Sequence, residues 1–90
     1  MKVDFSTLAT RIVEYQQSII GPMAWSEAKK VTGLAVEGNH VKLTGNEKEV
    51  LSSLVTQYES LFGKASVEAC KDAIRPLISQ ERIDLPTILQ

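Results

Sequence analysis

The sequence predicts an all-α domain in which four helices form two αα-hairpins. Apolar residues recur three and four positions apart over most of the chain, which is the spacing of one helical face. Glycines follow two of these stretches, at Gly21 and Gly63, where glycine favours the end of a helix. A chain of 90 residues, 43% hydrophobic and 23% charged, has the size and composition of one soluble domain.

The first helix is expected at about residues 5–20. Asp4 or Ser6 can cap its first turn, because a short oxygen-bearing side chain accepts an unpaired backbone N–H there. Gly21 ends it, and Pro22 suits the first turn of the next helix, where a missing N–H costs nothing. Its apolar residues, nearly all on one helical face, are Phe5, Leu8, Ala9, Ile12, Val13, Tyr15, Ile19 and Ile20.

The second helix is expected at about residues 22–32, with Ala24, Ala28 and Val31 on one face. Residues 33–44 follow it and form either a small β-hairpin, turning at Gly38-Asn39, or an irregular crossover. A hairpin of two strands is marginal alone, so it would have to lie against helices.

The third helix, at about residues 47–62, carries the strongest signals. Asn46 followed by Glu49 is an asparagine version of the capping box, and Gly63 ends the helix in the manner of an αL cap. Its apolar positions are Val50, Leu51, Leu54, Val55, Tyr58, Leu61 and Phe62.

The fourth helix is expected at about residues 66–78, with Ser66 as its cap. Pro76 removes one helical hydrogen bond, which predicts a kink or an early end there. Residues 79–90 form a tail with a further turn starting at Asp84. The tail either packs on the helices or adds its apolar side chains to a partner's groove.

The two halves of the chain resemble each other when the sequence is shifted by 42 positions. Ser18 then falls on Ser60, Ile19 on Leu61, and Gly21 on Gly63. Each half becomes a helix, a glycine turn and a second helix, a unit that cannot bury its apolar face alone. This near-repeat favours two hairpins joined by the 32–46 crossover.

Composition argues against several classes of function. A net charge of -1 gives no broad positive field, so binding to nucleic acid is not expected. The single cysteine, Cys70, cannot form an intramolecular disulfide, and the chain has no apolar run of signal-peptide or membrane-spanning length. These features predict a cytoplasmic protein that does not enter a membrane.

Few residues are suited to catalysis. One histidine, His40, falls in the expected turn region, and Cys70 falls on an apolar helix face, so a catalytic pair is not expected. These two soft ligands are also too few for a zinc cage. Glu47 and Glu49 are explained by the favourable end of a helix dipole. The sequence predicts a non-enzymatic protein with no cofactor and no metal.

A protein-interaction role is the first hypothesis, and the candidate partner-binding residues form two groups. One is Trp25 with Lys29 and Lys30, although a core position is the favoured alternative for Trp25. The other is the tail set of Leu85, Ile88 and Leu89.

Two alternatives remain. One is a small-ligand cavity lined by Tyr15, Met23, Trp25 and Tyr58. The other is weak nucleic-acid binding through Lys29 and Lys30.

The segment Ile19-Ile20-Gly21-Pro22-Met23-Ala24 resembles a feature of small helical modules in bacterial signalling proteins. These modules, frequent in cyanobacteria, carry an Ile-Gly-Pro-(Met or Ile)-Ala turn between two helices. The position of Leu61-Phe62-Gly63 is similar too. The resemblance implies a protein partner or self-association within a signalling or regulatory assembly, and it assigns no binding residue.

Overall fold

Within residues 4–79 and 84–90, which the computed structural model describes, the chain forms four α-helices and one antiparallel β-hairpin. The predicted helical fold is therefore confirmed, and of the two alternatives for residues 33–44 the hairpin is correct. In chain order the elements are α1 (Phe5–Ile20), α2 (Met23–Ala28), β1 (Leu34–Glu37), β2 (His40–Leu43), α3 (Glu47–Phe62), α4 (Lys64–Ile78) and the 3-10 turn η1 (Thr87–Leu89).

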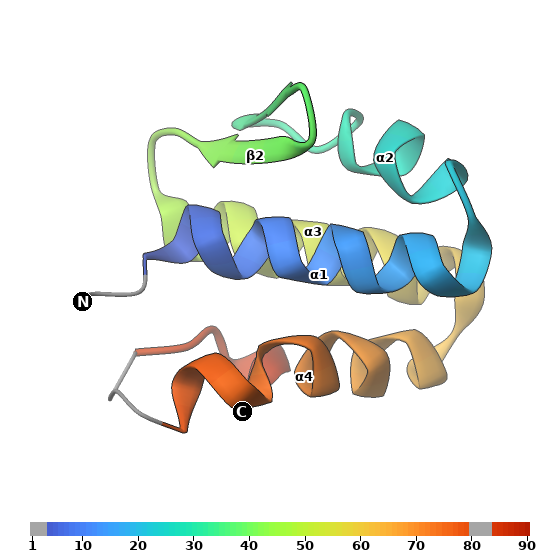
Figure 1. Cartoon of the computed structure of the whole chain (residues 1–90). Helices are drawn as coiled ribbons and strands as arrows, with labels where there is room; N and C mark the ends of the chain where they lie inside the picture. Colours follow the sequence, from blue (N-terminus) through green and yellow to red (C-terminus); the bar gives the residue numbers. More distant parts are fainter. Residues whose placement is uncertain (1–3, 80–83) are drawn as a thin grey trace.

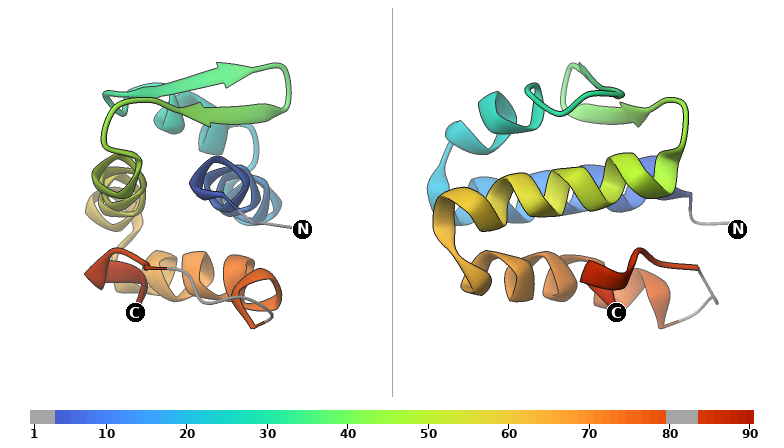
Figure 2. Two further views of the ribbon diagram at one scale, coloured as in Figure 1. Left: turned by 90° about the vertical axis from the view of Figure 1, so that its left-hand side faces the viewer. Right: turned by 180° about the vertical axis from the view of Figure 1, so that it is seen from behind.

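The elements form three layers, with α1 and α3 side by side in the middle (Figure 1). These two helices run in the same direction, so both end at the same end of the molecule. On one side α2 and the hairpin cover them, and on the other side α4 and η1 do (Figure 2). The second helix of the first half, α2, and the second helix of the second half, α4, therefore lie on opposite sides of the α1–α3 layer.

Short polar side chains cap α1 and α3 as the sequence predicts. Asp4 Oδ1 accepts the backbone N–H of Thr7 at 2.8 Å, and Asn46 Oδ1 accepts that of Glu49 at 3.2 Å. Hydrogen bonds from the backbone and hydroxyl of Thr7 hold the pKa of Asp4 below its usual range. Ser6, the alternative cap, bonds instead to the hairpin.

The two glycine junctions have nearly the same backbone conformation. Gly21 has φ 77 and ψ -158, and Gly63 has φ 82 and ψ -174. The N–H of Gly21 donates to the Gln17 carbonyl at 2.9 Å, and that of Gly63 to the Glu59 carbonyl at 2.8 Å. The near-repeat is therefore structural at its junctions. Because ψ is extended, the αL conformation expected at Gly63 is wrong, although the helix does end there.

The second helix is shorter than predicted, because α2 ends at Ala28 and not near residue 32. The N–H groups of Lys30 and Val31 bond to carbonyls three residues back, which tightens the chain before it turns into β1. Gly33 follows with φ 88, and a Cβ at this position would meet Val50 at 2.7 Å. The close approach of the backbone to α3 thus requires glycine where the helix had been predicted to end.

The fourth helix differs from its prediction at its start and ends at Ile78, as its expected bounds have it. It begins at Lys64, and Ser66 is not its cap, since the Ser66 hydroxyl donates to the Gly63 carbonyl at 2.9 Å. It also does not end early at Pro76. The N–H of Ser79 bonds to the Arg75 carbonyl at 3.1 Å, so helical bonding resumes after the proline.

The hairpin is stabilised by α1. Gly38 has φ 65 and Asn39 has no positive φ, the sign pattern of a type II′ turn, and Val36 faces Val41 across the two strands. On the other edge of β2, the N–H of Val41 donates to Thr10 Oγ1 and the N–H of Leu43 to Ser6 Oγ, both at 3.0 Å. Helix hydroxyls therefore take the place of a third strand.

The tail packs on the helices. Leu85 and Leu89 are buried in the core, and Ile88 is half-buried against it. Lys48 Nζ also lies 2.9 Å from Asp84 Oδ2, which ties the tail to the start of α3. Of the two alternatives for this segment, packing is the one observed. Ile83, a further apolar residue of the tail, lies outside the described residues.

Candidate functional site

Large apolar side chains are exposed at the end of the molecule where both glycine junctions lie. They occupy the last two turns of α1, the first residue of α2 and the last turn of α3, which meet at the same end in Figures 1 and 2. We call them the junction-end surface: Tyr15, Ile19, Met23, Leu61 and Phe62. Among the described residues, these are the large hydrophobic side chains that are exposed.

Two of the three most exposed members lie at equivalent positions of the two halves. Ile19 is 59% exposed in the last turn of α1, and Leu61 is 46% exposed in the last turn of α3. Each lies seven positions after a buried residue of its helix, Ile12 or Leu54, and so continues the same apolar stripe. Clusters of this kind at one end of a small soluble protein are typical of contact surfaces.

Charge is depleted at the same end. The twelve consecutive residues from Tyr15 to Ser26 contain no Asp, Glu, Lys or Arg, in a chain that is 23% charged. The central part of a protein interface is depleted of charge and enriched in aromatic residues and methionine. The junction-end surface shares both properties.

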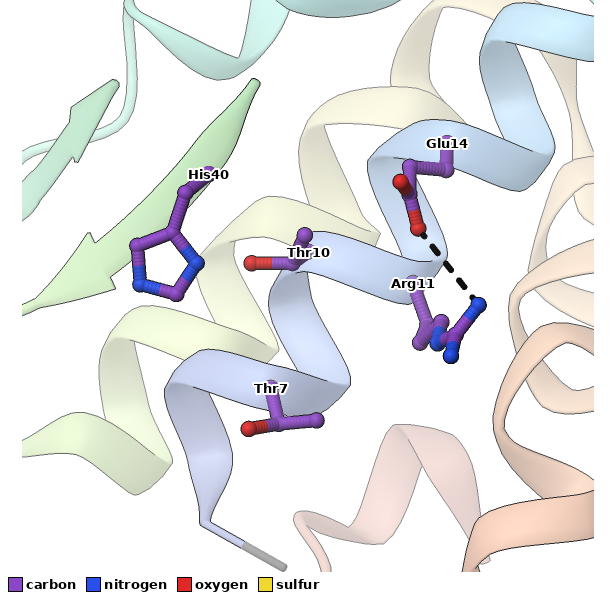
Figure 3. A pocket seen from close by; sticks show the side chains of 5 residues that line it. All are labelled: Thr7, Thr10, Arg11, Glu14 and His40. Atoms are coloured by element: carbon purple, nitrogen blue, oxygen red, sulfur yellow. Dashed lines mark ion pairs between the residues drawn. The ribbon is translucent and has the colours of Figure 1, made fainter. Parts of the chain in front are cut away.

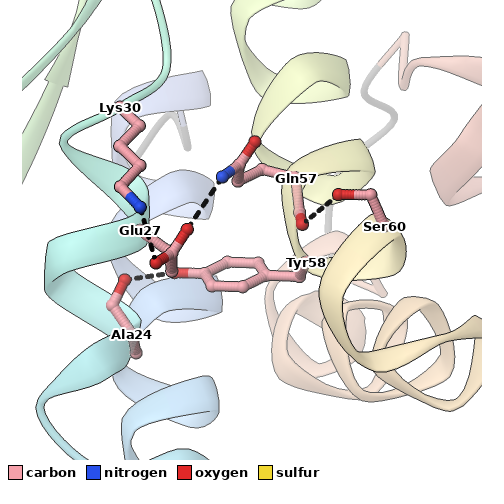
Figure 4. A network of polar contacts seen from close by, with 6 residues as sticks. All are labelled: Ala24, Glu27, Lys30, Gln57, Tyr58 and Ser60. Atoms are coloured by element: carbon pink, nitrogen blue, oxygen red, sulfur yellow. Dashed lines mark hydrogen bonds and ion pairs between the residues drawn. The ribbon is translucent and has the colours of Figure 1, made fainter.

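Beneath this surface, a polar network joins α2 to α3 (Figure 4). The Tyr58 hydroxyl donates to the Ala24 carbonyl at 2.7 Å. Glu27, buried on α2, accepts from Lys30 Nζ at 3.0 Å and from Gln57 Nε2 at 2.8 Å. These two donors hold the pKa of Glu27 below its usual range, and burial raises the pKa of Tyr58.

The buried polar groups of this network are already hydrogen-bonded within the protein, so none is left free to bind a substrate. In residues 4–79 and 84–90, every buried side-chain nitrogen or oxygen has a hydrogen-bond partner. A carboxylate that is already paired and hydrogen-bonded supports packing, because removing it would leave its donors unsatisfied. We therefore assign Glu27, Gln57 and Tyr58 to the attachment of α2.

Cys70 lies in the core between α1 and α4, as predicted. Gln16 Nε2 donates to the Ser66 carbonyl at 3.1 Å and contacts Cys70 Sγ at 3.4 Å. Burial raises the pKa of the thiol to about 11, so that the thiolate is disfavoured at neutral pH. His40 is exposed at the start of β2, across the α1–α3 layer from α4 (Figure 1). His40 and Cys70 therefore do not form a pair.

A polar pocket of about 270 Å³ lies between α1 and His40 (Figure 3). The hydroxyl of Thr7 donates to Asp4 at 2.8 Å and that of Thr10 to the Ser6 carbonyl at 2.9 Å, so both protons are already used. Arg11 pairs loosely with Glu14 at 3.8 Å. The pocket's positive and negative groups offset each other, and no ligand class is favoured.

A second pocket, of about 450 Å³, opens between the base of the hairpin and the start of α3. Its lining includes Thr32, Thr44 and Ser53. Neither pocket is lined by the four residues of the predicted ligand cavity, and one of these, Tyr58, is fully buried. The small-ligand hypothesis therefore gains no support from its predicted residues.

The predicted partner-binding residues do not come together. Trp25 is half-buried against the core, and its indole N–H donates to Gln17 Oε1 at 2.9 Å. Lys29 is exposed, and Lys30 is exposed but paired with Glu27. The tail, with its buried Leu85 and Leu89, lies on the opposite side of the α1–α3 layer (Figure 2).

Ile19, Leu61 and Phe62 were missed as surface residues because they fit the helical apolar pattern, whereas Tyr15 and Met23 were expected to line a ligand cavity. Ile19-Ile20 and Leu61-Phe62 each place two apolar residues directly before a glycine. Adjacent residues on a helix point about 100° apart, so both members of such a pair do not face one core equally. Together with the charge-free stretch, these pairs are the signal that sequence reasoning could have used.

Within the described part of the chain, no group of three or more His, Cys, Asp or Glu side chains is placed to hold a metal ion. None of the described helices has both the length and the apolar composition to cross a membrane. Comparisons of the chain with protein-family models, with curated proteins and with solved structures gave no match.

Proposed function

We propose that this protein is a non-enzymatic helical interaction domain that binds another protein chain through the junction-end surface. The observation that carries the proposal is the exposure of Ile19 and Leu61 at one end of an otherwise well-covered core, beside a stretch of twelve residues without charge. A role as an accessory or self-associating subunit agrees with the resemblance of residues 19–24 to helical modules of bacterial signalling proteins.

Among the described residues, the side chains best suited to catalysis are already buried, paired or hydrogen-bonded, which supports a binding role over an enzymatic one. Cys70 is buried with a raised pKa, Glu27 is paired, and the hydroxyls of Thr7 and Thr10 are engaged. Binding, by contrast, needs only exposed apolar area with a polar rim. Gln17, Ser18 and Ser60 provide exposed polar positions next to the apolar residues.

The test compares the wild-type protein with the double variant Ile19→Ser/Leu61→Ser. Both side chains are exposed, so the variant should keep the fold, which circular dichroism can check. A matched control, Ala35→Ser/Lys42→Ser, changes two exposed positions on the hairpin. Association is measured by sedimentation of the purified protein and by capture from a lysate with each immobilised variant.

We expect every association of the wild type, with itself or with another protein, to be lost in the junction-end variant and kept in the hairpin control. Association that survives in the folded junction-end variant, or that is absent from the wild type in both measurements, would overturn the proposal.

A further inference from the structure

We propose that the chain bound by the junction-end surface is a second copy of the same protein, placed by a two-fold axis. This inference rests on the proposed function and adds the identity of the partner. A two-fold interface brings the same patch of both copies together, so the patch must be complementary to itself. Both the apolar residues and the charges of this end meet that requirement.

The charges of the junction end are one acid and one base. Residues 15–26 contain no charged side chain, and the residues that flank Gly63, in the last turn of α3 and at the first position of α4, include Glu59 and Lys64. Glu59 is half-buried in the last turn of α3, and Lys64 is exposed at the first position of α4. In a two-fold pair, Glu59 of each copy can face Lys64 of the other, which gives two equivalent ion pairs around an apolar centre.

Both charges are placed against the helix dipoles. An acid is unfavourable near the C-terminus of a helix and a base is unfavourable near the N-terminus, yet Glu59 and Lys64 occupy those places. Nor do the described residues give either of them an ion-pair partner within the chain. Helix stability therefore does not explain these two residues, whereas a partner with the opposite pattern does.

The size of the surface makes the association weak. The molecule measures 30 × 25 × 20 Å along its principal axes. A face spanned by the two shorter extents has a projected area of roughly 500 Å², and a standard interface takes ~800 Å² from each partner. We therefore expect a reversible dimer with a dissociation constant in the micromolar range or above.

Sedimentation equilibrium of the purified protein from about 10 μM to about 1 mM tests this directly. The average mass should rise with concentration from the 9.9 kDa monomer toward the dimer. Glu59→Lys and Lys64→Glu should each weaken self-association about tenfold, because each places like charges opposite each other. Both substitutions agree with the helix dipoles, so neither should unfold the chain.

An equimolar mixture of the two single variants gives the decisive result. At positions 59 and 64, one chain then carries two lysines and the other carries two glutamates. A mixed dimer therefore regains both ion pairs, and the average mass of the mixture should approach that of the wild type. Failure of the mixture to associate more strongly than its separate components would overturn the two-fold pairing. A wild-type protein that stays monomeric over the whole range would overturn self-association. Binding to a different protein, if lost with Ile19→Ser/Leu61→Ser, would still support the proposed function.

Discussion

The hydroxyl of Tyr58 on α3 donates a 2.7 Å hydrogen bond to the backbone carbonyl of Ala24 on α2. Both residues are fully buried, and the bond joins two elements that are 34 positions apart in the chain. Since α2 has only six residues, it depends on such contacts with α3 more than on its own helical bonds.

Tyr58→Phe should therefore destabilise the protein by about 1 kcal/mol, because it removes one buried hydrogen bond and little volume. Urea unfolding followed by circular dichroism measures the change. Tyr15→Phe is the matched control, since Tyr15 is exposed and should stay within about 0.5 kcal/mol of wild type. Equal effects of the two substitutions would show that the Tyr58 bond does not stabilise the fold.

Gly21→Ala and Gly63→Ala should each cost about 1–3 kcal/mol, because positive φ with extended ψ is accessible almost only to glycine. Space is not the cause, since a Cβ at either position meets nothing within 4 Å. The near-identical conformations predict similar losses in urea unfolding. A large loss at one junction with none at the other would contradict the structural repeat.

Thr10→Val should open the hairpin locally. The substitution keeps the shape of the side chain but leaves the N–H of Val41 without its acceptor, at a cost of about 1–3 kcal/mol. Hydrogen exchange followed by NMR should show faster exchange at the Val41 amide. Thr56→Val, at an exposed position of α3, controls for a valine in a helix, and comparable exchange at Val41 in the two variants would refute the proposed support of β2.

Acid should weaken the attachment of α2 through Glu27. The folded pKa of this carboxyl is lowered by Lys30 and Gln57, so its contribution is present above the unfolded value near 4.5 and is lost as the pH falls through the folded value. Glu27→Gln should flatten the dependence of unfolding free energy on pH below 4.5. Glu68→Gln, at an exposed position of α4 where the carboxylate lies 3.4 Å from Lys71 Nζ, is the matched control for the loss of one paired acid. A slope that is the same for wild type and Glu27→Gln would count against the assignment.

Features set by neighbouring residues were predictable from the sequence. The caps at Asp4 and Asn46 and the helix ends at Gly21 and Gly63 depend on a few adjacent residues, and all four are observed. The hairpin was half predictable. Gly38-Asn39 indicated a turn, but its strands need hydroxyls of α1 more than 30 residues away, which no local pattern reveals.

The candidate site was less predictable, because periodicity does not distinguish covered from uncovered apolar residues. Ile19 and Leu61 have the same helical spacing as the buried Ile12 and Leu54, yet their side chains are exposed. Leu85 and Leu89 illustrate the reverse case, since a tail with few helical signals is buried. Both outcomes are decided by tertiary packing.

The central position of α1 has a consequence for folding. This helix packs against α2, β2, α3 and α4, so its contacts extend from its nearest neighbour in the chain to residues near the other end. During synthesis, α1 therefore exposes its α4-facing side until α3 and α4 have left the ribosome. Contacts this distant slow the search for the native state, and the two similar halves should complete folding together, in one cooperative step.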